Sequence, residues 1–383
     1  MEGAYYNGQY LNRLERLGYS QAEIDNKLES AFEEMFYGPE GVRLCHCAGP
    51  DMMYIEDTGN HDVRTEGMSY AMMFCVQMNR QKEFDCLWRW VVTHMYLTEG
   101  ENAGYFAWSC HTDGSKNSDG PAPDGEEFFA MSLFFAANRW GSGEGVLDYA
   151  SWARRILHAC VHKGEEAGSG FPMWNPENHL IKFIPNCEFT DPSYHLPHFY
   201  ELFALWSDEC DRPFWHAAAA ASRQYLRKAC HARTGLSAEY AEYDGRPHRG
   251  DQPDRHDWFF SDAYRTLGNI ALDAQWFGDK DGWAQETAAH IQQFFEEKEH
   301  GQTNGIYLID GTPVEGNALH PVGLLATIAQ GSLILDDACA DEWLFSTPLR
   351  SGPRRYYDNC LYLFALLALS GHYRIWFPQE ATV

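Results

Sequence analysis

The chain has 383 residues, of which 45% are hydrophobic and 15% aromatic, and its 55 acidic and 29 basic side chains give a net charge of −26. A surface this negative repels phosphate backbones and anionic lipids, so we expect neither nucleic acid nor a membrane as a partner. Sugars are neutral and meet no such repulsion, and their flat faces stack on aromatic side chains. Most of the thirteen Trp are nevertheless expected in the core.

The sequence carries no signal for export or membrane insertion. No apolar run approaches the roughly 18 to 20 residues of a membrane span, and the opening segment MEGAYYNGQYLNRLERLGYS lacks a basic-then-apolar leader. The eleven Cys are scattered without CxxC pairs, and Cys45-His46-Cys47 is a weak zinc signal without a second pair. We expect a cytoplasmic protein with reduced, mostly buried cysteines.

Helical periodicity dominates the chain, beginning with a capping box from Ser20 to Glu23. Two kinds of helix then alternate. Helices that are apolar nearly all round, which is typical of buried helices, start near residues 66, 126, 193, 258, 319 and 357. Amphipathic helices start near residues 20, 81, 147, 213, 280 and 340, the last with the weakest pattern.

This alternation predicts six helical hairpins closed into a ring, with the apolar helices inside and the amphipathic helices outside. The predicted fold is therefore an all-α (α/α)6 barrel. No low-complexity stretch or linker interrupts the chain, so residues 1–383 are expected to form a single domain. An α-solenoid is the alternative, but the chain has no recognisable repeat motif.

Inner helices that all run the same way bring their N-termini to one end of the ring. Acidic side chains occupy these positions, and any one of them alone is more commonly a helix cap. The expected set is Glu66 at the first inner helix, Asp124 immediately before the second, Asp191 and Tyr194 at the third, and Asp262 and Arg265 at the fourth.

Paired carboxylates are what cleavage of a glycosidic bond requires, one protonated and one ionised. Arg265 lies three residues after Asp262 on the same predicted helix face and would keep Asp262 ionised. A helix N-terminus disfavours Glu66 as an acid, so burial and the charge of Asp124 would have to raise the pKa of Glu66.

Several segments resemble glycoside hydrolase family 8. The segments are TEGMSYAMM, PDGEEFFAMSLFFA, SDAYR, DPSY and RYYDN. Within that family, YFAWSC, KFIPNCEFTDPSYHLPHFYELF and LHPVGL resemble the reducing-end xylose-releasing exo-oligoxylanases, and the resemblance covers essentially the whole chain in order.

The resemblance implies an inverting enzyme that acts on xylo-oligosaccharides from xylotriose upward, without a metal or organic cofactor. It implies that Glu66 is the general acid, that Asp262 is the general base, and that Asp124 binds the sugar at the cleavage point. The remaining roles that it implies are Tyr194 holding the attacking water, Arg265 orienting the base, Trp108 stacking on a sugar, and Tyr357 lining the cavity.

An exo preference needs a wall beyond the leaving sugar, and the resemblance places it at Leu319-His320-Pro321, at the start of the fifth inner helix. Proline disfavours helix in the residue before it, so His320 is expected in an extended kink. The competing interpretation is an ordinary helix start.

Three other functions remain open. An endo-acting β-1,4-glycanase of the same family would lack the wall. A sugar epimerase on the same toroid could use His195, His198, His256 and His320 as bases, and a non-catalytic protein could bind oligosaccharides without placed carboxylates. A nucleophilic hydrolase is not expected because GxSxG is missing. A dinucleotide-binding protein is not expected because GSGEG at 141 follows a helix instead of a strand.

Overall fold

The computed structural model describes residues 2–165, 169–250, 255–336 and 341–379. The chain divides into two compact, interleaved units. Unit 1 comprises Met1–Arg43, Glu188–His198 and Ala220–Tyr373, and unit 2 comprises Leu44–Cys187, Phe199–Ala219 and Arg374–Val383.

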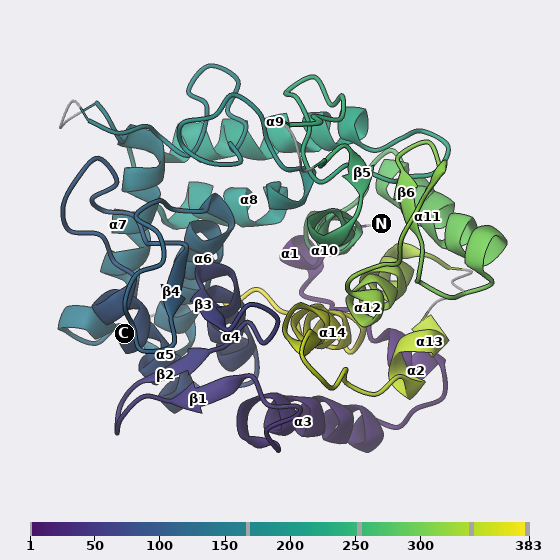
Figure 1. Cartoon of the computed structure of the whole chain (residues 1–383), viewed down its shortest axis with the longest axis horizontal. Coiled ribbons are helices and arrows are strands. Elements are labelled where there is room, and N and C mark those ends of the chain that lie inside the picture. Colours follow the sequence, from purple (N-terminus) through teal and green to yellow (C-terminus); the bar gives the residue numbers. More distant parts are fainter. Residues whose placement is uncertain (1, 166–168, 251–254, 337–340, 380–383) are drawn as a thin grey trace. The chain divides into compact units, whose positions relative to one another are not determined.

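Unit 2 is built around two nearly all-buried helices, α4 (Thr65–Gln77) and α6 (Pro123–Trp140), which lie side by side (Figure 1). Each is flanked by an amphipathic helix, α4 by α5 (Gln81–His94) and α6 by α7 (Tyr149–His162). The 3₁₀ turn η1 (Gly145–Leu147) precedes α7. Two antiparallel strand pairs complete the unit: β1 (Cys45–Cys47) with β2 (Met53–Ile55), and β3 (Asp62–Arg64) with β4 (Ser109–His111).

Unit 1 has three apolar helices that Figure 1 shows nearly end-on, α10 (Arg265–Phe277), α12 (Pro321–Gly331) and α14 (Arg355–Leu369). Helix α11 (Trp283–Glu299) contacts α10 and α12, α13 (Asp341–Ser346) contacts α12 and α14, and α3 (Gln21–Tyr37) contacts α14. A small sheet has the order β5-β6-β7. The remaining short elements are α1 (Ala4–Asn7), α2 (Arg13–Arg16), η2 (Pro192–Tyr194), η3 (Ser261–Tyr264), η4 (Ser332–Ile334), β5 (Trp258–Phe259), β6 (Ile306–Leu308) and β7 (Pro313–Val314).

Helices α8 (Pro197–Trp206) and α9 (Arg212–Ala229) each run from one unit into the other. With them, each of the twelve expected helices has a counterpart, and the sixth outer helix is the six-residue α13. The capping box is confirmed, since the backbone N–H of Ser20 donates to Glu23 over 2.8 Å and the Ser20 hydroxyl accepts from the N–H of Glu23.

Two inner helices begin later than expected. Helix α8 starts at Pro197 because proline excludes helical backbone at Leu196, and the preceding segment forms the 3₁₀ turn η2. Helix α10 starts at Arg265 because residues near 258 pair as strand β5 with β6, and η3 follows. The predicted site residues Tyr194 and Asp262 therefore lie on 3₁₀ turns that precede the helices.

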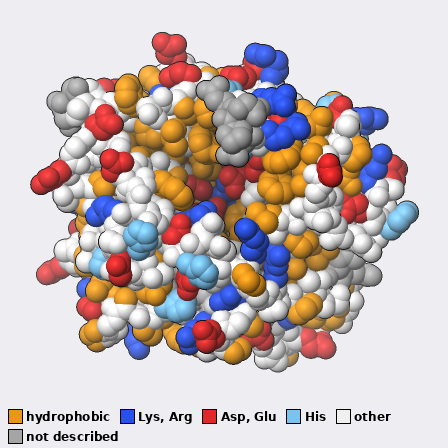
Figure 2. All heavy atoms as spheres, in the orientation of Figure 1, with side chains coloured by type: hydrophobic (Ala, Val, Ile, Leu, Met, Phe, Trp, Pro, Cys, Tyr) orange, Lys and Arg blue, Asp and Glu red, His pale blue; other side chains and the backbone are white. Residues whose placement is uncertain are grey.

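Six of the twelve described Trp are buried and the others are partly exposed, so the expectation of a mainly core role is only half met. Acidic, basic and hydrophobic side chains alternate over the face shown in Figure 2. Among the residues described, no helix has the length and hydropathy needed to span a membrane.

Candidate active site

Glu66 is the second residue of α4, and the antiparallel pairing of β3 with β4 fixes where that helix begins. Arg64 pairs with Ser109 across the two strands, and the N–H of Thr65 donates to the carbonyl of Trp108 over 2.9 Å. The Glu66 side chain is partly exposed. The strand pair therefore places Glu66 and Trp108 on adjoining segments.

Asp124 is brought close to the start of α4 by Gly125. A Cβ atom at Gly125 would lie 2.4 Å from the Cβ of Thr65, so the first turns of α4 and α6 touch at a point that only glycine permits. Asp124 is 5% exposed and accepts a hydrogen bond from the N–H of Gly125 over 2.9 Å. Asp124 lies inside the first turn of α6 and not before it, because Pro123 begins the helix.

Trp108 is partly exposed, as a stacking platform requires. The guanidinium carbon of Arg64 lies 5.3 Å from the Trp108 ring centre, and Arg64 is itself held by Asp57 over 3.1 Å and Asp62 over 3.0 Å. This cation–π contact occupies one face of the ring and orients it.

In unit 1, Arg265 lies between two carboxyl groups. Its Nη2 atom is 3.8 Å from Oδ1 of Asp262 and 3.9 Å from Oδ2 of Asp191. The predicted contact between Arg265 and Asp262 is therefore confirmed. Asp262 is about one-third exposed, whereas the other two side chains are buried, so Asp262 is the carboxylate of this group that reaches solvent.

Asp191 differs from Asp262 in its electrostatic environment. Burial raises the pKa of Asp191 well above its ordinary value and the charge of Asp262 raises it further, against the opposing effect of Arg265. Oδ1 of Asp191 accepts the N–H of Ser193 over 2.7 Å. Burial and the nearby charge of Asp262 therefore favour the neutral form of Asp191.

Two tyrosine rings complete this group. The guanidinium carbon of Arg265 lies 5.3 Å from the ring centre of Tyr194 and 5.8 Å from that of Tyr357. Tyr357 is 4% exposed, and its hydroxyl donates to the carbonyl of Ser261 over 3.3 Å. Ser261 has a φ of 31°, a strained value for a residue other than glycine, and it directly precedes Asp262. Tyr357 thus holds the turn that carries Asp262.

The Leu319-His320-Pro321 segment is fixed by a buried carboxylate on α14. Asp358 is fully buried and accepts the N–H groups of Val322 over 2.8 Å and Gly323 over 2.9 Å. Its other oxygen faces Nδ1 of His320 over 3.2 Å and the guanidinium of Arg350.

Arg350 also donates to the carbonyl of Leu319 over 2.8 Å, so both ends of the kink are anchored. The prediction of an extended backbone at His320 is wrong. Its φ of −127° and ψ of 67° avoid the helical region, as the following proline requires, but ψ falls short of extended backbone.

A comparison with known protein families identifies the family of this chain. Residues 20–371 match the model described as glycosyl hydrolases family 8. The chain belongs to glycoside hydrolase family 8.

Relatives of this glycoside hydrolase share most of its length. The reducing end xylose-releasing exo-oligoxylanase of Halalkalibacterium halodurans is 55% identical, with 99% of this chain and 97% of that protein covered. A protein of the same activity from Paenibacillus barcinonensis is also 55% identical, with 98% of this chain and 99% of that protein covered. A crystal structure of a reducing end xylose-releasing exo-oligoxylanase has a TM-score of 0.95 and 56% identity, with 99% of both chains covered. Family 8 structures of this kind are (α/α)6 barrels, which confirms the predicted fold class.

Sequence reasoning about this glycoside hydrolase missed two buried glutamates. Burial raises the pKa of Glu126 well above its ordinary value, and Oε1 of Glu126 accepts the N–H of Phe106 over 3.0 Å. Burial also raises the pKa of Glu239, as does the charge of Asp262, and Glu239 accepts from Trp258 Nε1 over 2.6 Å. The sequence pattern marks Glu126 only as the approximate start of an apolar helix, and no motif marks Glu239.

The histidines that an epimerase would need are engaged in packing. His195 is fully buried between the hydroxyls of Thr190 and Ser222, each 2.9 Å away, and burial lowers its pKa to about 3. Burial also lowers the pKa of His198. His256 faces Glu239 over 3.2 Å, and His320 faces Asp358. His195 and His198 are therefore buried in the fold, and His256 and His320 each face a buried carboxylate.

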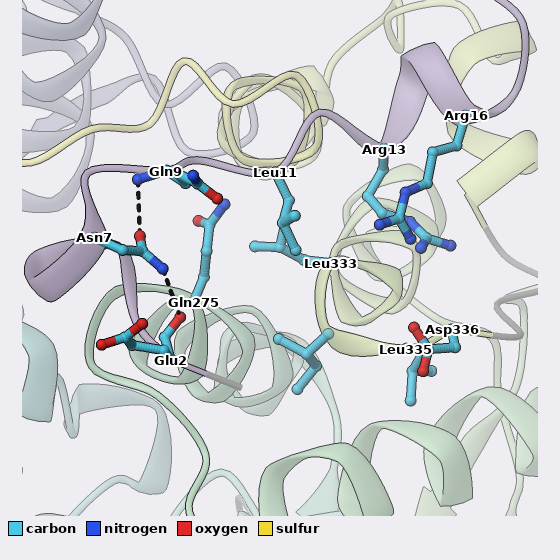
Figure 3. A pocket seen from close by; sticks show the side chains of 11 residues that line it. Glu2, Asn7, Gln9, Leu11, Arg13, Arg16, Gln275, Leu333, Leu335 and Asp336 are labelled. Carbon is cyan, nitrogen blue, oxygen red and sulfur yellow. Dashed lines mark hydrogen bonds between the residues drawn. The ribbon is translucent and has the colours of Figure 1, made fainter.

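A cavity of about 270 Å³ in unit 1 lies away from these groups (Figure 3). The N-terminal segment forms one side of it, where the N–H of Gln9 donates to Asn7 over 2.8 Å, and Gln275 on α10 and Leu333 on η4 contribute to the other. None of the predicted site residues lines this cavity, so it is a packing gap under the N-terminal segment.

Proposed function

We propose that this family 8 enzyme releases xylose from the reducing end of short β-1,4-xylo-oligosaccharides, xylotriose and longer, with inversion at the anomeric carbon. One observation carries the proposal: the 55% identity to reducing-end xylose-releasing exo-oligoxylanases extends over nearly the full length of both chains. Family membership itself argues against an epimerase or a non-catalytic sugar-binding protein. The endo-acting alternative within the family has less support.

In this proposal Glu66 protonates the leaving oxygen and Asp262 removes a proton from the attacking water. Inversion requires the two carboxyls to be roughly 6.5–9.5 Å apart, with the water between Asp262 and the sugar. The contact of Arg265 with Asp262, and the partial exposure of Asp262, support the base role. Arg265 orients the base through this contact.

Four further residues are proposed to bind the substrate or to position the groups that act on it. Asp124 holds the sugar at the cleavage point, and the close approach of the next residue, Gly125, to Thr65 of α4 supports this assignment. Tyr194, beside Arg265, holds the water, and Trp108 stacks on a sugar ring through the face that Arg64 leaves free. Tyr357 acts on the turn that carries the base.

The reducing-end preference is assigned to the Leu319-His320-Pro321 segment. A wall can exclude a second leaving sugar only if the wall is rigid, and the anchoring of both ends by Asp358 and Arg350 supports that role. His320 would contact the leaving xylose.

Two broader assignments belong to the same proposal. Residues 1–383 form a single catalytic domain, which is supported by a family match that runs through both units from 20 to 371. The enzyme works in the cytoplasm, which is supported by the ten described cysteines, all of them free thiols.

The test is digestion of xylo-oligosaccharides that carry a label on the reducing-end sugar. We expect the label to appear in free xylose from the first time point, with the shortened oligosaccharide unlabelled. Labelled xylobiose as an early product would show internal cleavage, and unlabelled xylose would show attack at the other end. Either result contradicts the proposal.

A further inference from the structure

Two histidines of α7 converge on one buried carboxylate in unit 2. His158 and His162 are four residues apart, so their side chains lie on the same face of the helix. Nε2 of His162 is 2.7 Å from Oδ1 of Asp211, and Nδ1 of His158 is 3.3 Å from Oδ2. These three side chains present two nitrogens and a carboxylate, all within 4.8 Å of one another.

We propose that His158, His162 and Asp211 bind a divalent transition-metal ion, with Zn²⁺ the best match. The ion would link α7 to the residue immediately before α9. None of these three residues is assigned to catalysis.

The chemistry of the ligands selects the class of metal. Imidazole nitrogens suit Zn²⁺, Ni²⁺ and Co²⁺, whereas Ca²⁺ and Mg²⁺ prefer shells made of oxygens. The side chain of Asp211 is only 1% exposed, so its charge is poorly screened by water.

A second carboxylate stands behind one of the histidines. Nδ1 of His162, the nitrogen turned away from Asp211, lies 2.8 Å from Oε2 of Glu165. Histidines that bind metals commonly donate their second N–H to a carboxylate, which fixes the tautomer and orients the ring. In that tautomer Nε2 of His162, which faces Asp211, is the nitrogen that would bind the ion.

The fourth ligand comes from water or from Cys210. The exposed thiol of Cys210 donates to Oδ1 of Asp211 over 3.2 Å and lies next to it in sequence. A site with three protein ligands and one further position has the coordination number that Zn²⁺ favours.

The chain offers a matched control. His46 and His61 also flank one carboxylate, that of Glu56, at 3.0 and 2.9 Å, but their ligand atoms do not converge into a metal-sized group among the described residues. If His158, His162 and Asp211 form a metal site, removing their histidines should abolish Zn²⁺ binding, and removing His46 and His61 should not. If the histidines only pair with a carboxylate, the two double variants should bind Zn²⁺ alike.

The experiment is calorimetric titration of ZnSO₄ into the tag-free, metal-stripped chain, followed by melting curves. We expect one saturable site per chain and a melting temperature that rises with Zn²⁺ but not with Mg²⁺. The double variant His158→Ala/His162→Ala should lose both effects, and His46→Ala/His61→Ala should keep both. Wild-type protein without saturable binding, or equal binding by the two double variants, would overturn the proposal.

A milder variant guards against a folding defect. Glu165 is exposed, so Glu165→Gln should fold normally and weaken Zn²⁺ binding roughly 10- to 100-fold by releasing the ring of His162. Unchanged affinity in this variant would contradict the assigned geometry. The visible spectrum with Co²⁺ identifies the fourth ligand, because a thiolate charge-transfer band that Cys210→Ser removes would assign it to Cys210. Hydrolysis of xylotriose is expected to be unaffected by stripping the metal.

Discussion

The two proposed catalytic carboxyls have different surroundings. Glu66 lies in the first turn of α4, beside the first turn of α6 that carries Asp124. Asp262 has a cation 3.8 Å away. Inverting cleavage requires one of the two carboxyls to donate a proton and the other to accept one.

Glu66→Gln should lower the rate on xylo-oligosaccharides by roughly 10²- to 10⁴-fold, because the leaving sugar oxygen then receives no proton. Much of the loss should be recovered with a leaving group that is already a stable anion, such as fluoride. The measurement is kcat on both substrate types, with Glu83→Gln, in the first turn of α5, as the control. Equal losses on both substrates would remove Glu66 from the acid role.

Asp262→Ala should abolish turnover whatever the leaving group. The variant can still protonate the leaving oxygen, but it can no longer activate the attacking water. Added azide should restore a glycosyl product of inverted configuration. Asp257→Ala, which breaks a contact of 2.8 Å with Arg255 a few residues away, controls for disturbance of this segment. Substantial activity of Asp262→Ala on a fluoride substrate without azide would argue against the base role.

The raised pKa of Glu126 predicts a dependence of stability on pH. Above its ordinary value of 4.5 the glutamate ionises in the unfolded chain, while burial keeps it protonated in the folded chain. The stability contributed by the protonated form is complete below that value, and it is lost as pH rises towards the folded pKa.

Glu126→Gln cannot ionise and keeps an acceptor for Phe106, so the melting temperature of the wild type should fall relative to this variant between pH 4.5 and neutrality. Melting curves of both proteins across that range check the expectation, and parallel pH profiles would contradict it.

At the scale of elements, the start of α12 depends on α14. Asp358 accepts hydrogen bonds from the first turn of α12 with one oxygen and faces His320 and Arg350 with the other. Asp358 is therefore a positioning residue for the proposed wall.

Asp358→Asn should release the kink, because the amide nitrogen cannot accept from Arg350 or His320. One unsatisfied buried donor costs about 1–3 kcal/mol. The ratio of activity on xylohexaose to activity on xylotriose should rise, in the same direction as for His320→Ala. The control is Asp273→Asn, which changes a carboxyl on α10 that pairs with Arg223 on α9. Wild-type ratios in both Asp358→Asn and His320→Ala would make the segment an ordinary helix start.

The spacing of apolar residues predicted the helices because each buried helix face is formed by residues three or four positions apart in the sequence. The same spacing does not determine where a helix begins. The starts of α8 and α10 were misplaced because Pro197 and the β5–β6 pairing determine the backbone there. No local pattern distinguishes Asp358, because its partners in α12 lie more than thirty residues earlier. Glu239 was missed because its significance comes from Trp258 and Asp262, which no local spacing reveals.

At the scale of the whole chain, composition agrees with the proposed substrate. A net charge of −26 repels anions, but a neutral xylo-oligosaccharide meets no such barrier. We propose that water activated by Asp262 displaces the leaving xylose directly, without a covalent intermediate.

Proton NMR of xylotetraose hydrolysis during the first minutes tests that claim most directly. Direct attack on a β-linkage produces the new reducing end as the α anomer, before mutarotation equilibrates it. We predict that the α signal of the new reducing end rises first and that the β signal follows at the rate of mutarotation. A new reducing end that appears first as the β anomer would show retention and would contradict the roles assigned to Glu66 and Asp262.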